Sequence, residues 1–249
     1  MSYKVRIKFN KYDHMVFIGH LDLMRYFQKA FRRSGIDICY TTGFSPHQVI
    51  SFAQPLGVGV YSNGEYVDIS VESEPDTEQI KSALQGVMVE GVDILSVISL
   101  PDNAPTSMAS VMAADYTVRF RKEYVPAFDV AKAAPDFMAQ QQIMITKETK
   151  KGSRELDLKE HIYDLKMTDG RSSAKRDLLN KCDGPAIYMM LDASSGGNIK
   201  PGLVMQEIFK FAGQTLGNFD LIVTREDLYA EKEMGGQKEY ISLGDIRSV

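Results

Sequence analysis

YKVRIKFN at residues 3–10 and GHLDLMRYFQKAFRRSG at residues 19–35 set the first half of the fold. The first segment alternates polar and apolar side chains with period two, which predicts a half-buried strand. In the second segment Met24, Phe27 and Phe31 recur on one helix face, and a glycine follows the last turn as a stop signal. The chain is therefore predicted to start with a strand followed by an amphipathic helix.

The next segments complete a unit of strand, helix, strand, strand, helix, strand. Residues 64–72 (GEYVDISVE) alternate most clearly and follow a predicted turn at SNG, residues 62–64. The other expected elements are a short β-rich run over 36–42, an interrupted extended run over 48–60, a helix over 76–91 and a strand over 92–100.

LPDNAPTS at residues 100–107 is typical of a linker, and a similar order of elements follows it. Strands are expected over 114–120, 186–194 and 219–230, a strand pair over 142–162 turned at Lys151-Gly152, and helices over 125–140, broken at Pro135, and 200–213. The simplest interpretation is an α+β protein of two tandem ferredoxin-like (βαββαβ) halves with antiparallel sheets, divided as domains 1–104 and 105–249. A single larger α+β domain is the alternative.

The composition indicates a globular protein, because 44% of the residues are hydrophobic and 25% are charged. No run approaches the length of a membrane-spanning helix, and the N-terminus shows no signal-peptide pattern, so the expected location is the cytoplasm. The only two cysteines, Cys39 and Cys182, lie far apart in the sequence. We therefore expect neither a cysteine-held zinc or iron–sulfur cluster nor any other cofactor.

The net charge of −4 is unevenly distributed along the chain. Residues 1–50 carry eight Lys or Arg against three Asp, and the rest of the chain is correspondingly acidic. On a helical wheel four of the cations form one stripe: Arg25, Lys29, Arg32 and Arg33. Such a stripe predicts a surface that binds RNA phosphates, although a solvated helix face is the structural alternative.

His20 lies on the apolar side of the same helix, in its first turn. It is either a histidine held by hydrogen bonds within the fold or a site base whose pKa is lowered by the positive end of the helix dipole. His14 and His161 have no comparable context and are expected at the surface.

The stretch Gly43-Phe44-Ser45-Pro46-His47 predicts a tight turn that carries a second candidate histidine. Pro46 restricts the backbone and so sets the direction of His47, while Phe44 is either a core anchor or a ring for base stacking. His20 and His47 are the candidate catalytic residues, and whether the protein is an enzyme stays open. The glycines of GVGVYSNGE (57–65) match no phosphate-binding fingerprint and predict a bulge or a bent strand.

Residues 19–69 resemble the signature region of the bacterial radical-SAM-linked family, an uncharacterised domain of unknown function. Its members read approximately SHLDLMR, then RALRRA, GF.PHP, SFA.PL and EY.D, whereas this chain has Gly19 for the usual Ser and Gln48 after the histidine. Residues 155–162 and 196–209 resemble two further family segments, with Lys159 and Lys200 where Arg is usual. Lysine keeps the charge but loses the bidentate fork of arginine.

The resemblance implies a partner more than an activity. Family members are typically encoded beside, or fused to, a radical SAM protein and often near ribosomal-protein and ribonuclease genes. The chain has no CxxxCxxC motif, so the iron–sulfur chemistry would belong to that partner. RNA is the second implied partner.

These observations predict an RNA-binding accessory protein that acts with a radical SAM enzyme in tRNA or rRNA modification or processing. Arg25, Lys29, Arg32, Arg33, Phe44 and Lys200 are the candidate RNA-binding residues. One alternative is a metal-independent endoribonuclease that uses His20 and His47, by analogy with CRISPR repeat-processing nucleases of tandem ferredoxin-like fold. A protein–protein adaptor that binds no nucleic acid is another. A pseudouridine synthase is disfavoured, since the catalytic Asp in its Arg-Thr-Asp context is missing.

Overall fold

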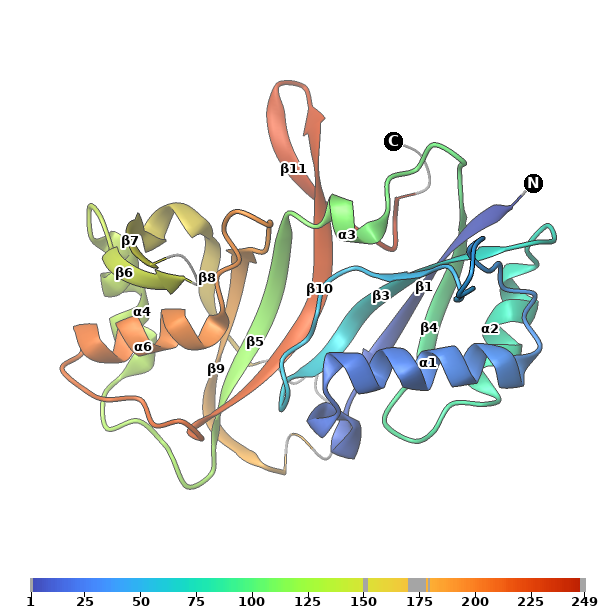
Figure 1. Ribbon diagram of the computed structural model, residues 1–249. Helices are drawn as coiled ribbons and strands as arrows, with labels where there is room; N and C mark the ends of the chain where they lie inside the picture. The colour runs from blue at the N-terminus through green and yellow to red at the C-terminus, as the bar shows by residue number, and fades with distance from the viewer. Residues whose placement is uncertain (1, 150–151, 170–177, 179, 247–249) are drawn as a thin grey trace. The chain divides into compact units, whose positions relative to one another are not determined.

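The computed structural model describes residues 2–149, 152–169, 178 and 180–246 (Figure 1). The protein is of the α+β class, with a large, mostly antiparallel sheet and few helices. The chain divides into two compact units, Met1–Met112 with Asp227–Val249, and Ala113–Glu226. Among the described residues no helix has the length and apolar character needed to cross a membrane.

Among its described residues, the first unit contains one long α-helix, two shorter α-helices and five complete strands. Its elements are β1 (Tyr3–Lys11), η1 (Asp13–Phe17), α1 (His20–Ser34), β2 (Ile50–Phe52), β3 (Tyr61–Val71), α2 (Thr77–Gln85), β4 (Ile94–Leu100), α3 (Ser107–Ser110) and β11 (Gln237–Ser242). The strand β10 (Leu221–Met234) begins in the second unit and ends in the first.

The strands of the first unit are ordered β4-β1-β3-β10, with β2 also paired to β3 and β11 paired to β10. In the antiparallel pair of β1 and β3, Ile7 lies opposite Val67. The prediction of purely antiparallel sheets is wrong, because the sheet is mixed. The neighbouring strands β3 and β10 are not consecutive in the sequence and are not joined by a hairpin. No tight turn therefore forces them to be antiparallel.

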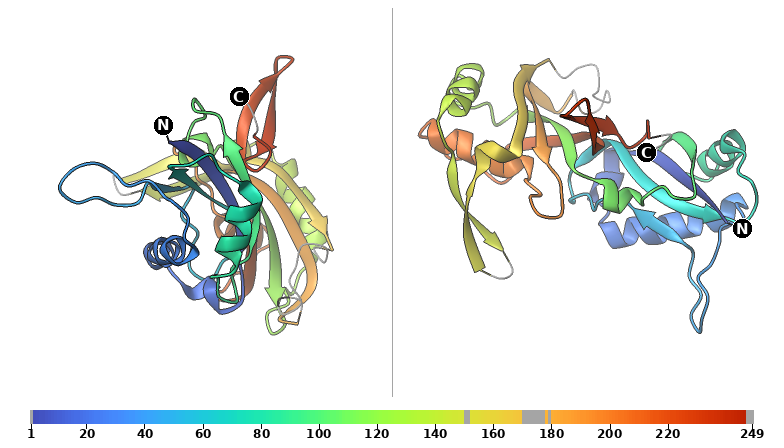
Figure 2. Two further views of the ribbon diagram at one scale, coloured as in Figure 1. Left: turned by 90° about the vertical axis from the view of Figure 1, so that its right-hand side faces the viewer. Right: turned by 90° about the horizontal axis from the view of Figure 1, so that it is seen from above.

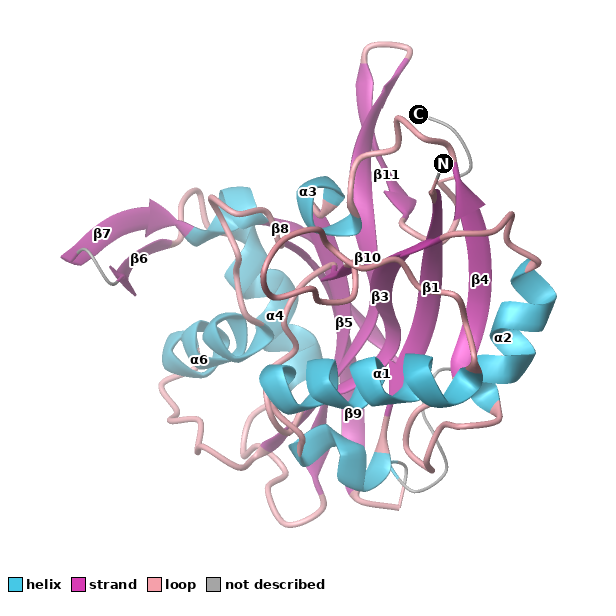
Figure 3. Ribbon diagram, turned by 45° about the vertical axis from the view of Figure 1, so that its right-hand side comes forward, coloured by secondary structure: helices cyan, strands magenta, loops and turns pink. Residues whose placement is uncertain are grey.

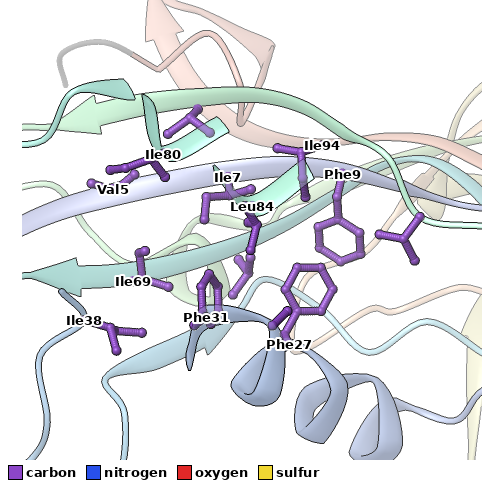
Figure 4. Packing of buried hydrophobic residues seen from close by; sticks show 14 of the residues in the cluster. Val5, Ile7, Phe9, Phe27, Phe31, Ile38, Ile69, Ile80, Leu84 and Ile94 are labelled. Atoms are coloured by element: carbon purple, nitrogen blue, oxygen red, sulfur yellow. The ribbon is translucent and has the colours of Figure 1, made fainter. Parts of the chain in front are cut away.

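Helices α1 and α2 lie on the same side of β1, β3 and β4 (Figure 3). Alternate residues of β1, namely Val5, Ile7 and Phe9, are fully buried, as the period-two pattern predicts. They pack against Phe27 and Phe31 of α1 in one hydrophobic cluster (Figure 4). The apolar face of α1 is thus fixed against the sheet, and its opposite face is left to solvent.

The local signals at the ends of the helices act as predicted. Gly35 ends α1 with a φ of 73°, a left-handed conformation that favours glycine. At the start of α2 the side chain of Asp76 accepts hydrogen bonds from the backbone N–H groups of Glu78 and Gln79.

A partly buried polar network joins β10 and β11 to β1 and β3 within the first unit. Asp227 of β10 accepts hydrogen bonds from Tyr66 of β3, from Ser242 of β11 and, at 2.7 Å, from the Nζ of Lys8 of β1. Burial raises the pKa of Tyr66, and the neighbouring Asp227 raises it further. Tyr66 therefore stays a neutral hydrogen-bond donor to this carboxylate.

The second unit is built on strands in the order β10-β5-β9-β8. Its elements are β5 (Ala113–Arg121), α4 (Val130–Ala139), β6 (Met144–Thr149), β7 (Gly152–Asp157), η2 (Leu158–His161), β8 (Ile162–Thr168), β9 (Cys182–Asp192) and α6 (Pro201–Phe211). The strands β6 and β7 form a separate two-stranded sheet. Phe209 of α6 packs near Phe120 of β5 and Phe128, with ring centroids 6.1 and 4.9 Å apart.

Three local predictions are wrong. The SNG segment, residues 62–64, lies within β3 and not in a turn. The register of β3 against β1 shifts between Phe9 and Lys11, so β3 carries an extra residue there and continues as a strand. Pro135 lies inside α4 and does not break it, because it removes only its own N–H donor while the residues on both sides stay helical. The strands β8 and β11 were not predicted separately, and Lys151 of the expected turn lies outside the described residues.

Candidate nucleic-acid interface

The solvent-facing side of α1 carries the four predicted cations, Arg25, Lys29, Arg32 and Arg33, and all of them are exposed. They lie opposite Phe27 and Phe31, which anchor the helix in the core. The helix thus presents a mainly basic face with one acid, Asp22, in its first turn; the face is here called the α1 basic face and is defined by these four cations.

Little of this charge is neutralised within the fold. Arg25 donates to Asp22 at 3.1 Å, but both side chains are about two-thirds exposed, at 70% and 67%, so the pair is weak in water. Arg33 donates to the carbonyl oxygen of Val87 at 3.2 Å, which leaves its charge uncompensated. Within the described part of the chain, Lys29 and Arg32 have no hydrogen-bond or ion-pair partner, so their donors are available to an anionic ligand.

The other cations of the basic N-terminal region serve the fold. Arg6 is buried and donates to both carboxylate oxygens of Asp68. Lys8 pairs with Asp227, and Lys11 is only 1% exposed. The exposed positive charge of residues 1–50 therefore lies mainly on α1. The exposed excess of positive charge is smaller than the sequence count suggests.

His20 begins α1 and packs its ring edge-on against Phe52 of β2, with ring centroids 5.6 Å apart. Burial lowers the pKa of His20; Glu65 opposes this effect and Lys11 adds to it. His20 is thus a partly buried, neutral imidazole at neutral pH, able to accept a proton. No hydrogen bond holds its ring in the described structure.

Lys11 and Glu65, which influence His20, were not predicted as site residues. The Nζ of Lys11 donates to the carbonyl oxygen of Ile18 at 2.7 Å, directly before α1. Glu65 is 3% exposed and accepts from Ser62 at 2.6 Å. Lys11 continues the alternate buried positions of β1, and Glu65 is in phase with Val67 and Ile69 of β3, so period two places both charges on buried faces. The sequence therefore carried a signal for both residues.

The loop that contains Gly43-Phe44-Ser45-Pro46-His47 projects on the side of the sheet that carries α1 (Figure 2). Gly43 has a φ of 117°, which requires glycine, and Phe44 is fully exposed. The Nδ1 of His47 lies 3.1 Å from the Oγ1 of Thr41, whose hydroxyl also accepts the backbone N–H of His47. The loop is thus held at its base and presents an aromatic ring at its tip.

The two candidate catalytic histidines make separate contacts. His20 contacts Phe52, His47 contacts Thr41, and no hydrogen bond or ring contact joins the two in the described structure. Their action as one acid–base pair therefore stays a prediction and gains no support from a direct contact.

Gln48, which follows His47, is buried, and neither atom of its side-chain amide has a hydrogen-bond partner within the described residues. Buried amides without partners are rare in folded proteins. Gln48 is thus a buried polar side chain of this segment whose hydrogen-bonding capacity is not met within the described residues.

Lys200 and His161 belong to the second unit. Lys200 is the exposed N-cap residue of α6. The expectation that His161 is a surface residue is wrong. Its Nδ1 lies 2.7 Å from Asp192, and its side chain is only 20% exposed. The partner, Asp192, lies 31 residues away in the sequence, so no local pattern could reveal the pair.

Residues 4–201 match a family described as an uncharacterized protein conserved in bacteria (DUF2344). The chain belongs to this family. The region shared with DUF2344 includes α1, the loop of residues 41–47 and all of β3, and it extends to the first residue of α6. No curated protein matches the chain. Membership in DUF2344 assigns no activity, and the function must be argued from the residues described above.

Proposed function

We propose that this protein is an RNA-binding accessory protein that acts with a radical SAM enzyme in tRNA or rRNA modification or processing. The α1 basic face carries this proposal, because four exposed cations share one side of a helix whose other side is fixed in the core. Cations displayed in this way neutralise backbone phosphates and release the counterions bound to them.

The loop of residues 41–47 supplies the second element of the interface. Its exposed Phe44 offers a ring on which an unpaired base can stack, an interaction that tolerates any sequence. Because the loop projects on the side that carries α1, phosphate contacts and stacking can act on one strand (Figure 2). We assign Lys200 an additional phosphate contact in the second unit.

In this proposal the accessory protein binds RNA, and its partner supplies the reaction. The radical SAM enzyme holds the iron–sulfur cluster, while His20, a neutral imidazole beside the buried Lys11 and Glu65, lies at the start of the RNA-binding helix. Both proteins then work in the cytoplasm, where tRNA and ribosomes are found.

We also propose that the two halves of the sequence, 1–104 and 105–249, are tandem ferredoxin-like folds. In the first half β1, α1, β2, β3, α2 and β4 follow in the βαββαβ order, and β4, β1, β3 and β2 are neighbours in that order. In the second, β5, α4, β8, β9, α6 and β10 repeat it, with β6 and β7 inserted. The matching orders support the proposal.

Purification of the full chain from cells, with and without ribonuclease treatment, tests the proposed function. We expect RNA to co-purify at low salt, together with a radical SAM protein that carries an iron–sulfur absorption band. The ratio of absorbance at 260 to 280 nm is a sensitive readout, because the chain has no Trp. Absence of RNA at low salt would contradict the RNA-binding role. A radical SAM protein retained without RNA, before and after ribonuclease treatment, would instead indicate a protein–protein adaptor.

A further inference from the structure

In the second unit the carboxylate of Asp192, the last residue of β9, holds a histidine ring. Its Oδ2 lies 2.7 Å from the Nδ1 of His161, and its Oδ1 accepts the backbone N–H of Ser194 at 2.8 Å. Burial alone would raise the pKa of Asp192, but the hydrogen bonds from Ser194 and His161 outweigh burial and lower it. Asp192 is therefore ionised and only accepts, which places a proton of His161 on Nδ1. The Nε2 of His161 then accepts hydrogen bonds when the ring is neutral and donates to an anion when the ring is an imidazolium.

The loop of residues 193–200 wraps around this carboxylate. Gly197 approaches so closely that a Cβ at this position would overlap the carboxylate of Asp192. The backbone N–H of Ile199 donates to the carbonyl oxygen of Asp192 at 2.8 Å, and Asn198 takes a left-handed φ of 48°. The close approach to Asp192 and the left-handed turn fix the path of the loop.

Three cations from three different elements gather at this loop. Lys147 of β6 donates to the carbonyl oxygens of Gly197 and Asn198, and Arg154 of β7 donates to that of Gly196 at 3.3 Å. Lys200 ends the loop as the N-cap residue of α6 and has no hydrogen-bond partner in the described part of the chain.

The positive charge at this loop exceeds the negative charge. Burial lowers the pKa of Lys147, the nearby charges of Arg154 and Lys200 lower it further, and Asp192 opposes them. Three cations thus act against one carboxylate. Carbonyl oxygens occupy two donors of Lys147 and one of Arg154, so each retains further N–H groups. Like charges held together in this way repel each other, and an anion bound among them would relieve the repulsion.

We propose that Lys147, Arg154 and Lys200 bind a phosphoryl group at the 193–200 loop, with the Nε2–H of His161 as a further donor when its ring is a protonated imidazolium. A phosphoryl group suits this arrangement because its tetrahedral oxygens accept hydrogen bonds from several directions, whereas a planar carboxylate is matched by one guanidinium fork. The N-terminal end of α6, an eleven-residue helix, adds a favourable dipole, although Pro201 at its first position carries no N–H. The site goes beyond the α1 basic face and does not depend on it.

Histidine-selective NMR on the full chain tests the proposal with inorganic phosphate as the probe and sodium chloride at matched ionic strength as the reference. The four histidines act as internal reporters. We expect a saturable shift of the His161 ring signals with phosphate alone, while those of His20 and His47 stay in place. No saturable shift, or an equal shift with chloride, would overturn the proposal.

Variants separate ligand binding from support of the loop. Lys200→Gln removes a charge that makes no hydrogen bond in the described fold, so the loop should persist. We expect the apparent Kd for phosphate to rise about tenfold, because one charge-assisted hydrogen bond from Lys200 to phosphate is lost. Lys147→Met should weaken binding at least as much. The matched controls, Lys166→Met and Lys210→Met, alter exposed lysines of the same unit. Equal affinity in Lys200→Gln and the controls would contradict the assignment.

The phosphoryl group can belong to a small molecule or to RNA, and two further probes distinguish these sources. A short RNA with a 5′-phosphate is compared with the same RNA carrying a 5′-hydroxyl. A larger shift of the His161 signals with the phosphorylated strand than with the 5′-hydroxyl strand identifies an RNA end, and equal shifts with both strands identify an internal phosphodiester. Binding of free phosphate alone identifies a small-molecule ligand. All three results support a phosphoryl site, and failure of every probe to shift His161 would overturn it without bearing on the α1 basic face.

Discussion

Arg6 and Asp68 form a buried ion pair between β1 and β3, in which Nε lies 2.8 Å from Oδ1 and Nη2 lies 3.1 Å from Oδ2. Arg6 also donates to the carbonyl oxygen of Leu243, and Asp68 accepts the backbone N–H of Ser107. The pair thus connects the sheet to two segments that are distant in the sequence.

Asp68→Ala should lower the free energy of unfolding by about 3–5 kcal/mol, because it leaves the charge of Arg6 buried without a countercharge. Chemical denaturation of the purified chain measures the change. Asp164→Ala is the matched control, since it removes an exposed partner of Lys166 and should cost less than about 1 kcal/mol. Equal losses in both variants would contradict the role assigned to the Arg6–Asp68 pair.

Gly197→Ala should destabilise the second unit by about 1–3 kcal/mol, because the added Cβ overlaps the carboxylate of Asp192. Its neighbour provides the control. At Gly196 an added Cβ meets no atom within 4 Å, so Gly196→Ala should change stability by no more than about 0.5 kcal/mol. Thermal unfolding compares the two, and similar midpoints would show that Asp192 does not require glycine at position 197.

His20 should titrate below the ordinary histidine pKa of about 6.5 in a ring-proton NMR titration. Glu65→Gln should lower its pKa further, because the negative charge of Glu65 opposes the effect of burial. Since the folded pKa lies below the unfolded one, the unfolded chain binds more protons between them, and stability should fall as the pH drops through this window. His20→Gln should remove that part of the pH dependence, and a midpoint at or above 6.5 in the parent protein would contradict the burial of His20.

Local sequence patterns predicted the elements that form the core of the first unit. The alternation of β1, the apolar face of α1 and the Asp76 cap of α2 depend on neighbours in the chain, so they are readable in the sequence. The pairing of β10 with β3 depends on contacts between distant segments, as does the Asp227 network that accompanies it. No local pattern encodes such pairing, and the mixed character of the sheet was missed for this reason.

The candidate site was likewise predictable where neighbours in the chain determine the structure and not where distant segments meet. The exposed cations of α1 follow from helical periodicity, and the tight turn at Gly43 follows from its residue types. Burial of Lys11 and Glu65 follows from their phase in the alternating pattern of β1 and β3, but their closeness to His20 depends on how α1 packs on the sheet. The pairing of His161 with Asp192 depends on the packing of η2 against the end of β9, so sequence spacing alone gave no sign of it.

The affinity of the full chain for a mixture of cellular RNA at low salt, measured for two charge-matched variants, tests the central claim most directly. One variant replaces Arg25, Lys29, Arg32 and Arg33 with Gln, and the other replaces the exposed Lys122, Lys132, Lys166 and Lys210 with Gln. Both lose four positive charges, and circular dichroism should show that both stay folded. We predict that the α1 variant loses RNA binding and its salt dependence, while the control variant keeps most of its affinity. Equal affinities of the two variants would contradict the assignment of RNA binding to α1.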